Sequence, residues 1–288
     1  MLLRLVLAAG AAASALLLAD CASALNAVTS RSGFHTVSDV RYQGGDSGTY
    51  DLYVPNGASA RSPAVIFIHG GSWGTGSKRI YPFLGQSLAS AGIIVAIPNY
   101  RLYPETQFPG FVEDAAKATA SFAATLRSGE NGVPAGHHPL FLMGHSAGAE
   151  IAGLLAIDAR WLKADGIPLS RIAGFIGLAG PYDFLPLTDE RYKRIFPKRL
   201  RAESQPVNFV SGDEPPMLLI AGKADTTVDP KNTVSLANKA RVAGDKVQMT
   251  LYPGVSHIGA ISAFATALPL GNRAIRTETI RFIEEHSH

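Results

Sequence analysis

The sequence predicts a single α/β domain in which helices cover both faces of a mostly parallel sheet of about eight strands. Two observations lead to this fold class. Continuous apolar runs recur along the chain, and such runs are typical of strands that are buried on both faces. Segments with helical spacing of small and apolar residues lie between these runs, without internal repeats or a linker-like tract.

The composition agrees with a large buried core. The chain has 288 residues, of which 47% are hydrophobic and 17% are charged, and this balance is typical of a globular protein and not of a disordered one. The formal net charge is only +3. Because the charges are scattered outside one short basic segment, we expect no nucleic-acid partner. The sequence leaves the oligomeric state open.

Residues 1–24 are predicted to be an export signal. Arg4 precedes an apolar run, from Leu5 to Ala19, whose length of about fifteen residues suits a signal peptide and falls short of the roughly 20 that span a bilayer. Residues 25–288 are expected to form the α/β domain. We therefore expect the mature protein to work outside the cytoplasm.

The end of this signal is compatible with three forms of the exported protein. Cys21 is the only cysteine and has no partner for an internal disulfide. Its place in "LLLADC" resembles the lipobox of bacterial lipoproteins, except that Asp20 stands where that pattern has a small residue. A lipid on Cys21 would tether a periplasmic protein to a membrane. Free export after cleavage at Ala24 is the second alternative, and an uncleaved anchor is the third.

The expected strands follow one another along the chain. The stretches "DVRYQ" and "TYDLYVP" alternate in polarity and flank a turn-rich "GGDSG", which predicts an antiparallel pair. The buried strands are then predicted at residues 63–70, 92–100, 139–145, 171–180, 216–222 and 246–253. Between the second and third of these, Ala115, Ala118, Phe122 and Leu126 recur at helical spacing.

Residues 183–215 are too long for a simple crossover between two strands, so we expect a small cap over the strand ends. The segment contains the basic stretch "RYKRIFPKRLRAE". A solvated helix face is the favoured interpretation, and contact with anionic lipid headgroups is the alternative. Its aromatic residues are expected either to line a substrate pocket or to pack in the core: Phe184, Tyr192 and Phe196.

A candidate nucleophile lies in "LFLMGHSAGAEIAG". Ser146 stands between an expected strand and an expected helix, and Gly144 and Gly148 leave room for a tight turn. This arrangement is that of a nucleophile elbow, which presents the serine hydroxyl above the sheet. Glu150, one helical turn further on, is expected to face either the pocket or solvent.

A serine nucleophile needs a base and an orienting acid. Of the eight histidines, His257 follows the last expected strand, at the sheet edge where α/β proteins build their sites. The loop after the preceding strand carries Asp225 and Asp229. We prefer Asp225, because Asp229 precedes Pro230 and is expected to cap a helix.

The stretch "IFIHGGSWGTG" predicts the oxyanion hole. Glycines after His69 allow backbone N–H groups to turn toward a carbonyl oxygen without side-chain obstruction. With the N–H of Ala147, these groups would stabilise the tetrahedral intermediate.

These residues resemble the α/β-hydrolase superfamily, in its esterase branch with an H-G-G motif, which includes hormone-sensitive-lipase-like, feruloyl-esterase-like and arylformamidase groups. The resemblance extends from Val40 onward through "HGGSW", "NYRLYPE", "GHSAGAE", "GLAGPYD" and "GVSHIG". It implies a triad of Ser146, Asp225 and His257. It also implies that Gly71, Ser72 and Ala147 donate the oxyanion-hole N–H groups.

The resemblance favours a carboxylic ester hydrolase that acts on a small-molecule ester through an acyl-enzyme. Ser72 stands where hormone-sensitive-lipase-like members have a third glycine, and Trp73 follows it. The resulting H-G-G-x-W pattern is similar to the arylformamidase motif. Hydrolysis of N-formylkynurenine is therefore the first alternative, and a non-catalytic binding protein on the same scaffold is the second. Neither H-E-x-x-H nor a cysteine–histidine cluster occurs, so the sequence suggests no metal or other cofactor.

Overall fold

The computed structural model describes residues 25–268 and 270–288. Eight strands form one sheet in the order β1-β2-β4-β3-β5-β6-β7-β8. Their bounds are β1 Phe34–Arg41, β2 Thr49–Pro55, β3 Ala64–Ile68, β4 Ile94–Pro98, β5 Leu140–His145, β6 Ile172–Leu178, β7 Met217–Gly222 and β8 Val247–Tyr252. β2 pairs antiparallel with β1 and β4, and all other neighbours are parallel. The predicted fold class is confirmed.

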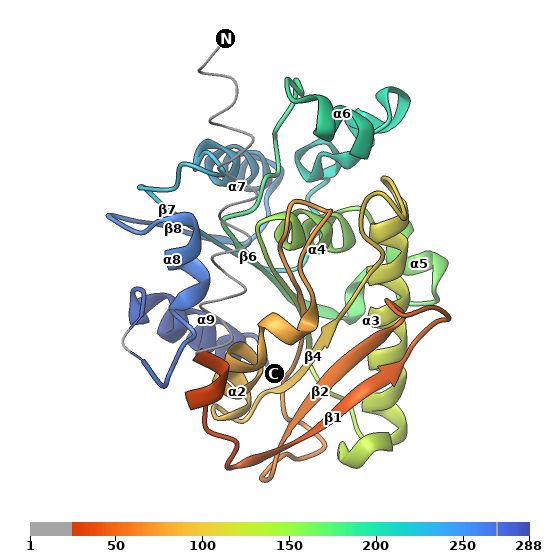
Figure 1. Ribbon diagram of the computed structural model, residues 1–288, viewed down its shortest axis with the longest axis vertical. Coiled ribbons are helices and arrows are strands. Elements are labelled where there is room, and N and C mark those ends of the chain that lie inside the picture. The colour runs from red at the N-terminus through yellow and green to blue at the C-terminus, as the bar shows by residue number, and fades with distance from the viewer. Residues whose placement is uncertain (1–24, 269) are drawn as a thin grey trace.

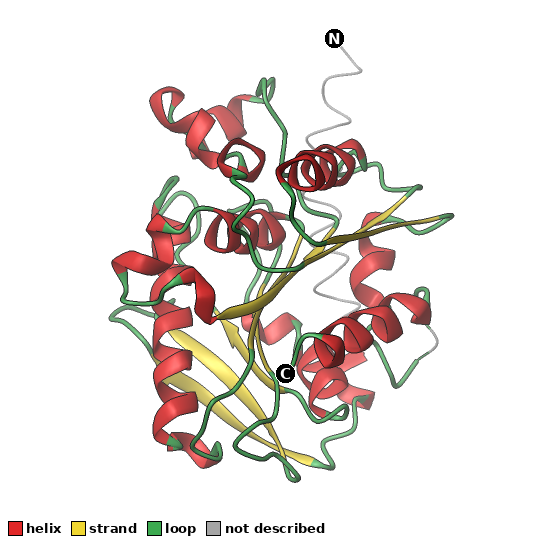
Figure 2. Cartoon of the chain, turned by 180° about the vertical axis from the view of Figure 1, so that it is seen from behind, coloured by secondary structure: helices red, strands yellow, loops and turns green. Residues whose placement is uncertain are grey.

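Helices cover both faces of this sheet (Figures 1 and 2). They are α2 Pro82–Ala89, α3 Gly110–Ser128, α4 Ala147–Ile157, α5 Arg160–Ala164, α6 Glu190–Ile195, α7 Lys231–Ala243, α8 His257–Ser262 and α9 Arg273–Glu285. α2, α8 and α9 contribute to the hydrophobic core on one face, and α3, α4, α5 and α7 to the core on the other. None of the helices within the described residues is both long and apolar enough to cross a membrane. The predicted signal with Cys21 lies outside the described residues.

The central strands show why apolar runs become buried strands. In β3, Ala64, Ile66 and Ile68 enter the core beneath α3 and α4, whereas Val65 and Phe67 enter the core beneath α2 and α9. Successive side chains of a strand point to opposite faces. A strand covered on both faces therefore has to be apolar at every position.

The first strand differs from its prediction. β1 begins at Phe34, five residues before the expected start at Asp39. Most of its side chains are exposed or half-buried, because it lies at the edge of the sheet next to β2 only. Its pairing with β2 also shifts register between Val37 and Val40, where Asp39 has a φ of 58°. An exposed, bulged edge strand has no regular apolar pattern by which the sequence would reveal it.

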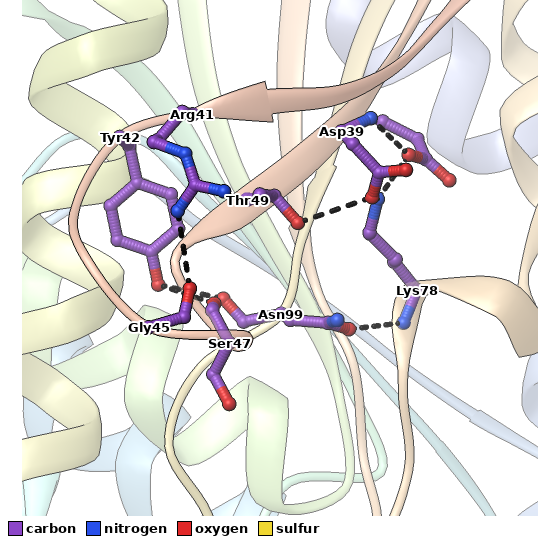
Figure 3. Close-up of polar contacts among 9 residues, drawn as sticks. Asp39, Arg41, Tyr42, Gly45, Ser47, Thr49, Lys78 and Asn99 are labelled. Atoms are coloured by element: carbon purple, nitrogen blue, oxygen red, sulfur yellow. Dashed lines mark hydrogen bonds and ion pairs between the residues drawn. The ribbon is translucent and has the colours of Figure 1, made fainter.

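A buried lysine connects the antiparallel pair of β1 and β2 to the rest of the domain (Figure 3). Lys78 is 3% exposed, and its ammonium group contacts the carboxylates of Asp39 and Asp51. The backbone N–H of Lys78 donates to Asn99 Oδ1 at 2.8 Å, just after β4. Tyr42 Oη donates to the carbonyl of Asn99 at 2.8 Å. These contacts fix the chain immediately after residues 69–76, which the sequence assigns to the oxyanion hole.

The segment 183–215 connects β6 to β7 and contains α6 with two short 3-10 helices, Lys198–Ser204 and Pro206–Phe209. In Figure 1, α6 lies at the edge of the molecule beyond α4. Part of its basic stretch is engaged internally, since Arg201 donates to the carbonyls of Phe196 and Lys193. Lys198 and Arg199 are exposed. The cap and lipid-contact interpretations of this segment stay predictions.

One buried ion pair holds the loop after β4 against α3. Asp114 is fully buried and accepts hydrogen bonds from the Nε and Nη2 atoms of Arg101, each at 2.8 Å, and from the Arg101 backbone N–H at 2.9 Å. Burial by itself would raise the pKa of Asp114. The hydrogen bonds from Arg101 outweigh burial and hold this pKa below its usual value. Arg101 of the "NYRLYPE" stretch is therefore a structural residue.

We predict that Asp114→Ala lowers the free energy of unfolding at pH 7 by about 3 kcal/mol, at the lower end of the range for one partner of a buried pair because Arg101 can reach water. A lowered carboxyl pKa stabilises the fold above the unfolded-state pKa of about 3.9, and this contribution is lost as the pH falls through the folded-state pKa. The difference in free energy of unfolding between wild type and variant, measured in urea, should therefore become smaller below about pH 4. Glu113→Ala, at an exposed neighbour on the same helix, should change stability by less than about 0.5 kcal/mol. Equal effects of the two substitutions would contradict the assignment.

Candidate active site

The predicted nucleophile occupies a strained turn between β5 and α4. Ser146 has φ 57° and ψ −127°, directly after the last residue of β5 and before Ala147, the first residue of α4. Positive φ is unfavourable for a residue with a Cβ, at a cost of roughly 1–3 kcal/mol. The surrounding contacts maintain it, and they include a 2.9 Å hydrogen bond from Ser146 N to the carbonyl of Leu178 at the end of β6.

Close backbone contacts explain the two glycines of the G-x-S-x-G pattern. A Cβ on Gly144 would lie 2.2 Å from the carbonyl oxygen of Gly148. A Cβ on Gly148 would lie 2.1 Å from the carbonyl oxygen of Ile68, at the end of β3. Both distances are far below van der Waals contact. The glycines therefore let α4 start directly against two central strands.

The predicted base and acid are in direct contact. His257 Nδ1 lies 2.8 Å from Asp225 Oδ2, and the two side chains are 8% and 0% exposed. Because an ionised carboxylate only accepts, Nδ1 carries the hydrogen and Nε2 is left with a lone pair. This is the tautomer that a general base requires. Asp225 follows β7, and His257 follows β8, so both come from the carboxyl edge of the sheet.

Backbone groups orient Asp225 from its other side. Asp225 Oδ1 accepts hydrogen bonds from Thr227 N at 2.8 Å and Val228 N at 2.9 Å. Burial alone would raise the pKa of Asp225, but the hydrogen bond from His257 and these two N–H groups lower it below its usual value. The carboxylate is therefore ionised at neutral pH.

Asp229 lies in a different environment. Its Oδ1 accepts from Lys231 N at 2.9 Å, at the start of α7, and its side chain is exposed. Asp229 therefore satisfies a free N–H at a helix start, as the neighbouring Pro230 suggested.

His257 differs in detail from the expected loop position, because it is the first residue of α8. Ser256 caps this helix, and its Oγ accepts a hydrogen bond from Gly259 N at 3.1 Å.

His145, the residue directly before Ser146 in the chain, contacts His257. The rings of His145 and His257 have centroids 4.7 Å apart. His145 Nε2 lies 3.1 Å from the carbonyl oxygen of His257. Within the described part of the chain, no hydrogen bond joins Ser146 directly to His257. Such bonds are often long in unliganded sites and shorten when substrate binds.

His145 is a site residue that the sequence did not reveal. Burial lowers its pKa to about 3, so the ring is neutral at physiological pH. Because a carbonyl oxygen only accepts, the hydrogen is on Nε2, which donates to the backbone of His257. His145 thereby supports the position at which the base begins α8. The sequence offered only its adjacency to Ser146, and the expectation that neighbouring side chains point apart gave no sign of this contact.

The predicted oxyanion loop also has unusual backbone geometry. Gly71 has φ 131° and Ser72 has φ 50°. The Gly71 carbonyl accepts from Gly74 N at 3.1 Å and from Thr75 N at 3.0 Å. Among the described residues, the N–H groups of Gly71, Ser72 and Ala147 donate to no protein acceptor. A donor without a protein acceptor is what an oxyanion hole requires.

His69 anchors the start of this loop. The side chain is fully buried, and its ring stacks on Tyr100 with centroids 4.4 Å apart. Tyr100 Oη donates to the His69 carbonyl at 2.7 Å, while His69 Nδ1 lies 2.8 Å from the Gly70 carbonyl. Burial lowers the pKa of His69 to about 4, so this histidine is neutral and supports the loop.

Comparison with known proteins identifies the family of the chain. The family model named BD-FAE matches residues 50–240. An isoprenylcysteine α-carbonyl methylesterase from Arabidopsis thaliana is 30% identical over 229 residues, which are 72% of this chain and 53% of that protein. A kynurenine formamidase from Danio rerio is 31% identical over 157 residues, 54% of this chain and 50% of that protein. The chain thus spans about half the length of the curated relatives it matches.

Solved structures support the same fold at lower sequence identity. Esterase B from Lactobacillus rhamnosis, solved with a tributyrin phosphonate inhibitor, has a TM-score of 0.78 and 22% identity. The match covers 98% of this chain and 96% of the esterase. The family match, the sheet order and the structural neighbours agree on one conclusion: the chain belongs to the BD-FAE family and has the α/β-hydrolase fold of carboxylesterase-type enzymes.

Proposed function

We propose that the protein is a serine hydrolase that cleaves carboxylic esters of small molecules through an acyl-enzyme. The observation that carries this proposal is the buried His257–Asp225 hydrogen bond of 2.8 Å, in the same site as the strained Ser146 that precedes α4 and whose neighbour His145 contacts His257. Packing alone does not require a carboxylate, an imidazole and a serine at one sheet edge. A general base held in one tautomer explains the arrangement.

The first half of the reaction forms the acyl-enzyme. Ser146 Oγ attacks the ester carbonyl carbon while His257 Nε2 takes the hydroxyl proton, and the carbonyl π electrons move onto oxygen. The N–H groups of Gly71, Ser72 and Ala147 stabilise this oxyanion, and each such donor contributes roughly 100- to 1000-fold in rate. The intermediate then collapses and the C–O bond to the alcohol breaks. His257 returns its proton to the departing oxygen.

The second half uses the same groups on water. His257 Nε2 takes a proton from a water molecule as its oxygen attacks the acyl carbon. Collapse of the second tetrahedral intermediate breaks the bond to Ser146 Oγ, which receives the proton from His257. The carboxylic acid leaves, and the ionised Asp225 stabilises the imidazolium in both halves.

Hydrolysis of an N-formyl amide is the second candidate. Two observations favour it: kynurenine formamidases are among the relatives, and Trp73 completes the H-G-G-x-W pattern. The same steps apply, with an amine in place of the alcohol, and the acyl group released is formate. A binding protein without catalysis is the third candidate, and it would not require an ionised Asp225 against the histidine.

Replacement of the proposed nucleophile tests catalysis itself. Ser146→Ala should reduce turnover of p-nitrophenyl acetate by more than about 1000-fold, because triad variants retain only the contribution of binding and the oxyanion hole. It should also abolish labelling by a fluorophosphonate probe. Ser170→Ala, at an exposed serine before β6, should match wild type in both measurements. Equal turnover and labelling in wild type and Ser146→Ala would refute the mechanism.

The two neighbouring aspartates provide a matched test of the acid. Asp225→Asn should lower kcat by about 10⁴-fold, since an amide in that place stabilises the wrong histidine tautomer. Asp229→Asn should leave kcat within about twofold, because its contribution is to the start of α7. Both kcat values should be measured on protein whose thermal unfolding midpoint has been determined. A larger loss in Asp229→Asn would reassign the acid.

A substrate series separates esters from formamides. We expect kcat/KM for p-nitrophenyl acetate or butyrate to exceed that for N-formylkynurenine under identical conditions. Both activities should disappear together in Ser146→Ala, since one site serves both. A higher kcat/KM for N-formylkynurenine would assign the protein as a formamidase.

A further inference from the structure

Glu150 is a buried acid in the first turn of α4 that the mechanism above does not use. Its side chain is 0% exposed, so it faces neither solvent nor an open pocket. Burial raises the pKa of this carboxyl well above its usual value. Loss of hydration disfavours the ionised form of Glu150 and favours its neutral acid.

The partner of Glu150 belongs to the proposed oxyanion loop. Trp73 Nε1 donates to Glu150 Oε2 at 2.9 Å, in a contact that joins positions 77 residues apart. The second oxygen of this carboxyl, Oε1, makes no hydrogen bond within the described residues. A neutral carboxyl offers one carbonyl oxygen to the indole N–H, which is itself buried and would otherwise lack an acceptor.

Trp73 continues the strained backbone that Ser72 begins. Ser72 has φ 50° and Trp73 has φ 56°, and two successive non-glycine residues in this region each cost roughly 1–2 kcal/mol. Contacts outside the loop have to hold them there. The Trp73 carbonyl accepts from Tyr103 N at 2.8 Å, and its ring packs edge-on against Phe196 with centroids 4.8 Å apart.

We propose that Glu150 is a positioning residue for the oxyanion hole. Through the indole of Trp73 it fixes the backbone at Ser72, so that the Ser72 N–H points at the same site as the N–H of Ala147. The two donors come from different segments, and Glu150 connects the helix that begins at Ala147 to the loop that contains Ser72. This inference rests on the proposed function, because it concerns the donors for that reaction.

The consequence for catalysis is specific. A donor contributes to the rate only when it lies about 2.7–3.1 Å from the developing oxyanion. Loosening of Ser72 should therefore weaken binding of the transition state more than binding of the ground-state ester. A Glu150 that only filled the core would affect stability and leave kcat unchanged.

The test compares substitutions at both ends of the hydrogen bond. Glu150→Leu keeps most of the volume but removes the acceptor, and Trp73→Phe removes the donor. Each should lower kcat for p-nitrophenyl acetate by about 10- to 100-fold with KM within about threefold, because one donor is misplaced and not removed. Glu150→Gln keeps a neutral acceptor and should recover most of this loss. The double variant should be no slower than the slower single variant, since both break one interaction.

Inhibitor affinity provides a second readout. Affinity for a trifluoromethyl ketone, which forms a tetrahedral oxyanion on the serine, should fall in Glu150→Leu by the same factor as kcat/KM. Leu155→Ala supplies the matched structural control, because Leu155 is fully buried on the same helix. It should lower stability by about 2–5 kcal/mol with kcat per folded molecule unchanged.

The outcomes separate this inference from the proposed function. Wild type that neither turns over esters or formamides nor reacts with a fluorophosphonate would overturn the function itself. Active wild type with unchanged kcat in Glu150→Leu and Trp73→Phe, or with equal losses in Glu150→Gln and Glu150→Leu, would overturn the positioning role alone. If Glu150→Leu does not fold, Trp73→Phe and Glu150→Gln decide the matter by the same criteria.

Discussion

The contact between Gly148 and the carbonyl of Ile68 is the constraint on which the site depends. A Cβ at Gly148 would lie 2.1 Å from that oxygen, so only glycine allows α4 to begin against the end of β3. The same contact places Ser146 beside the chain that leaves β3, which is the loop of Gly71 and Ser72. One close backbone approach thus brings the proposed nucleophile and the proposed oxyanion donors together, and the positive φ of Ser146 is the local cost of that approach.

Burial is the largest influence on the pKa of three groups around this turn. It shifts the pKa of His69, His145 and Glu150 toward the neutral form. Asp225 is the exception. Three hydrogen-bond donors surround it, and they outweigh the burial that would otherwise neutralise it. The ionised carboxylate of Asp225 provides the field that would stabilise an imidazolium at His257.

The segment 183–215 packs against the proposed oxyanion loop. Phe196 is fully buried against Trp73 and Phe184, which makes it part of the core. Arg191 of α6 donates to the carbonyl of Ser72 at 3.4 Å. The loop therefore contacts α4 on one side and this segment on the other.

The sheet, the glycine-flanked turn at Ser146 and the H-G-G segment could be predicted from the sequence, because each depends on neighbours along the chain. Doubly covered strands require apolar runs, and the turn at Ser146 requires glycines two residues away on either side. The sequence also narrowed the proposed acid to Asp225 or Asp229. The tertiary structure was needed to show that Asp225, and not Asp229, contacts His257. It was also needed to reveal the contacts of His145 with His257 and of Glu150 with Trp73, which join residues 112 and 77 positions apart. Burial and hydrogen-bond partners of this kind arise from packing between distant segments, and no local pattern encodes them. The start of β1 at Phe34 could not be predicted for a different reason. Backbone pairing with β2 holds this exposed edge strand, and such pairing does not require a regular apolar pattern of side chains.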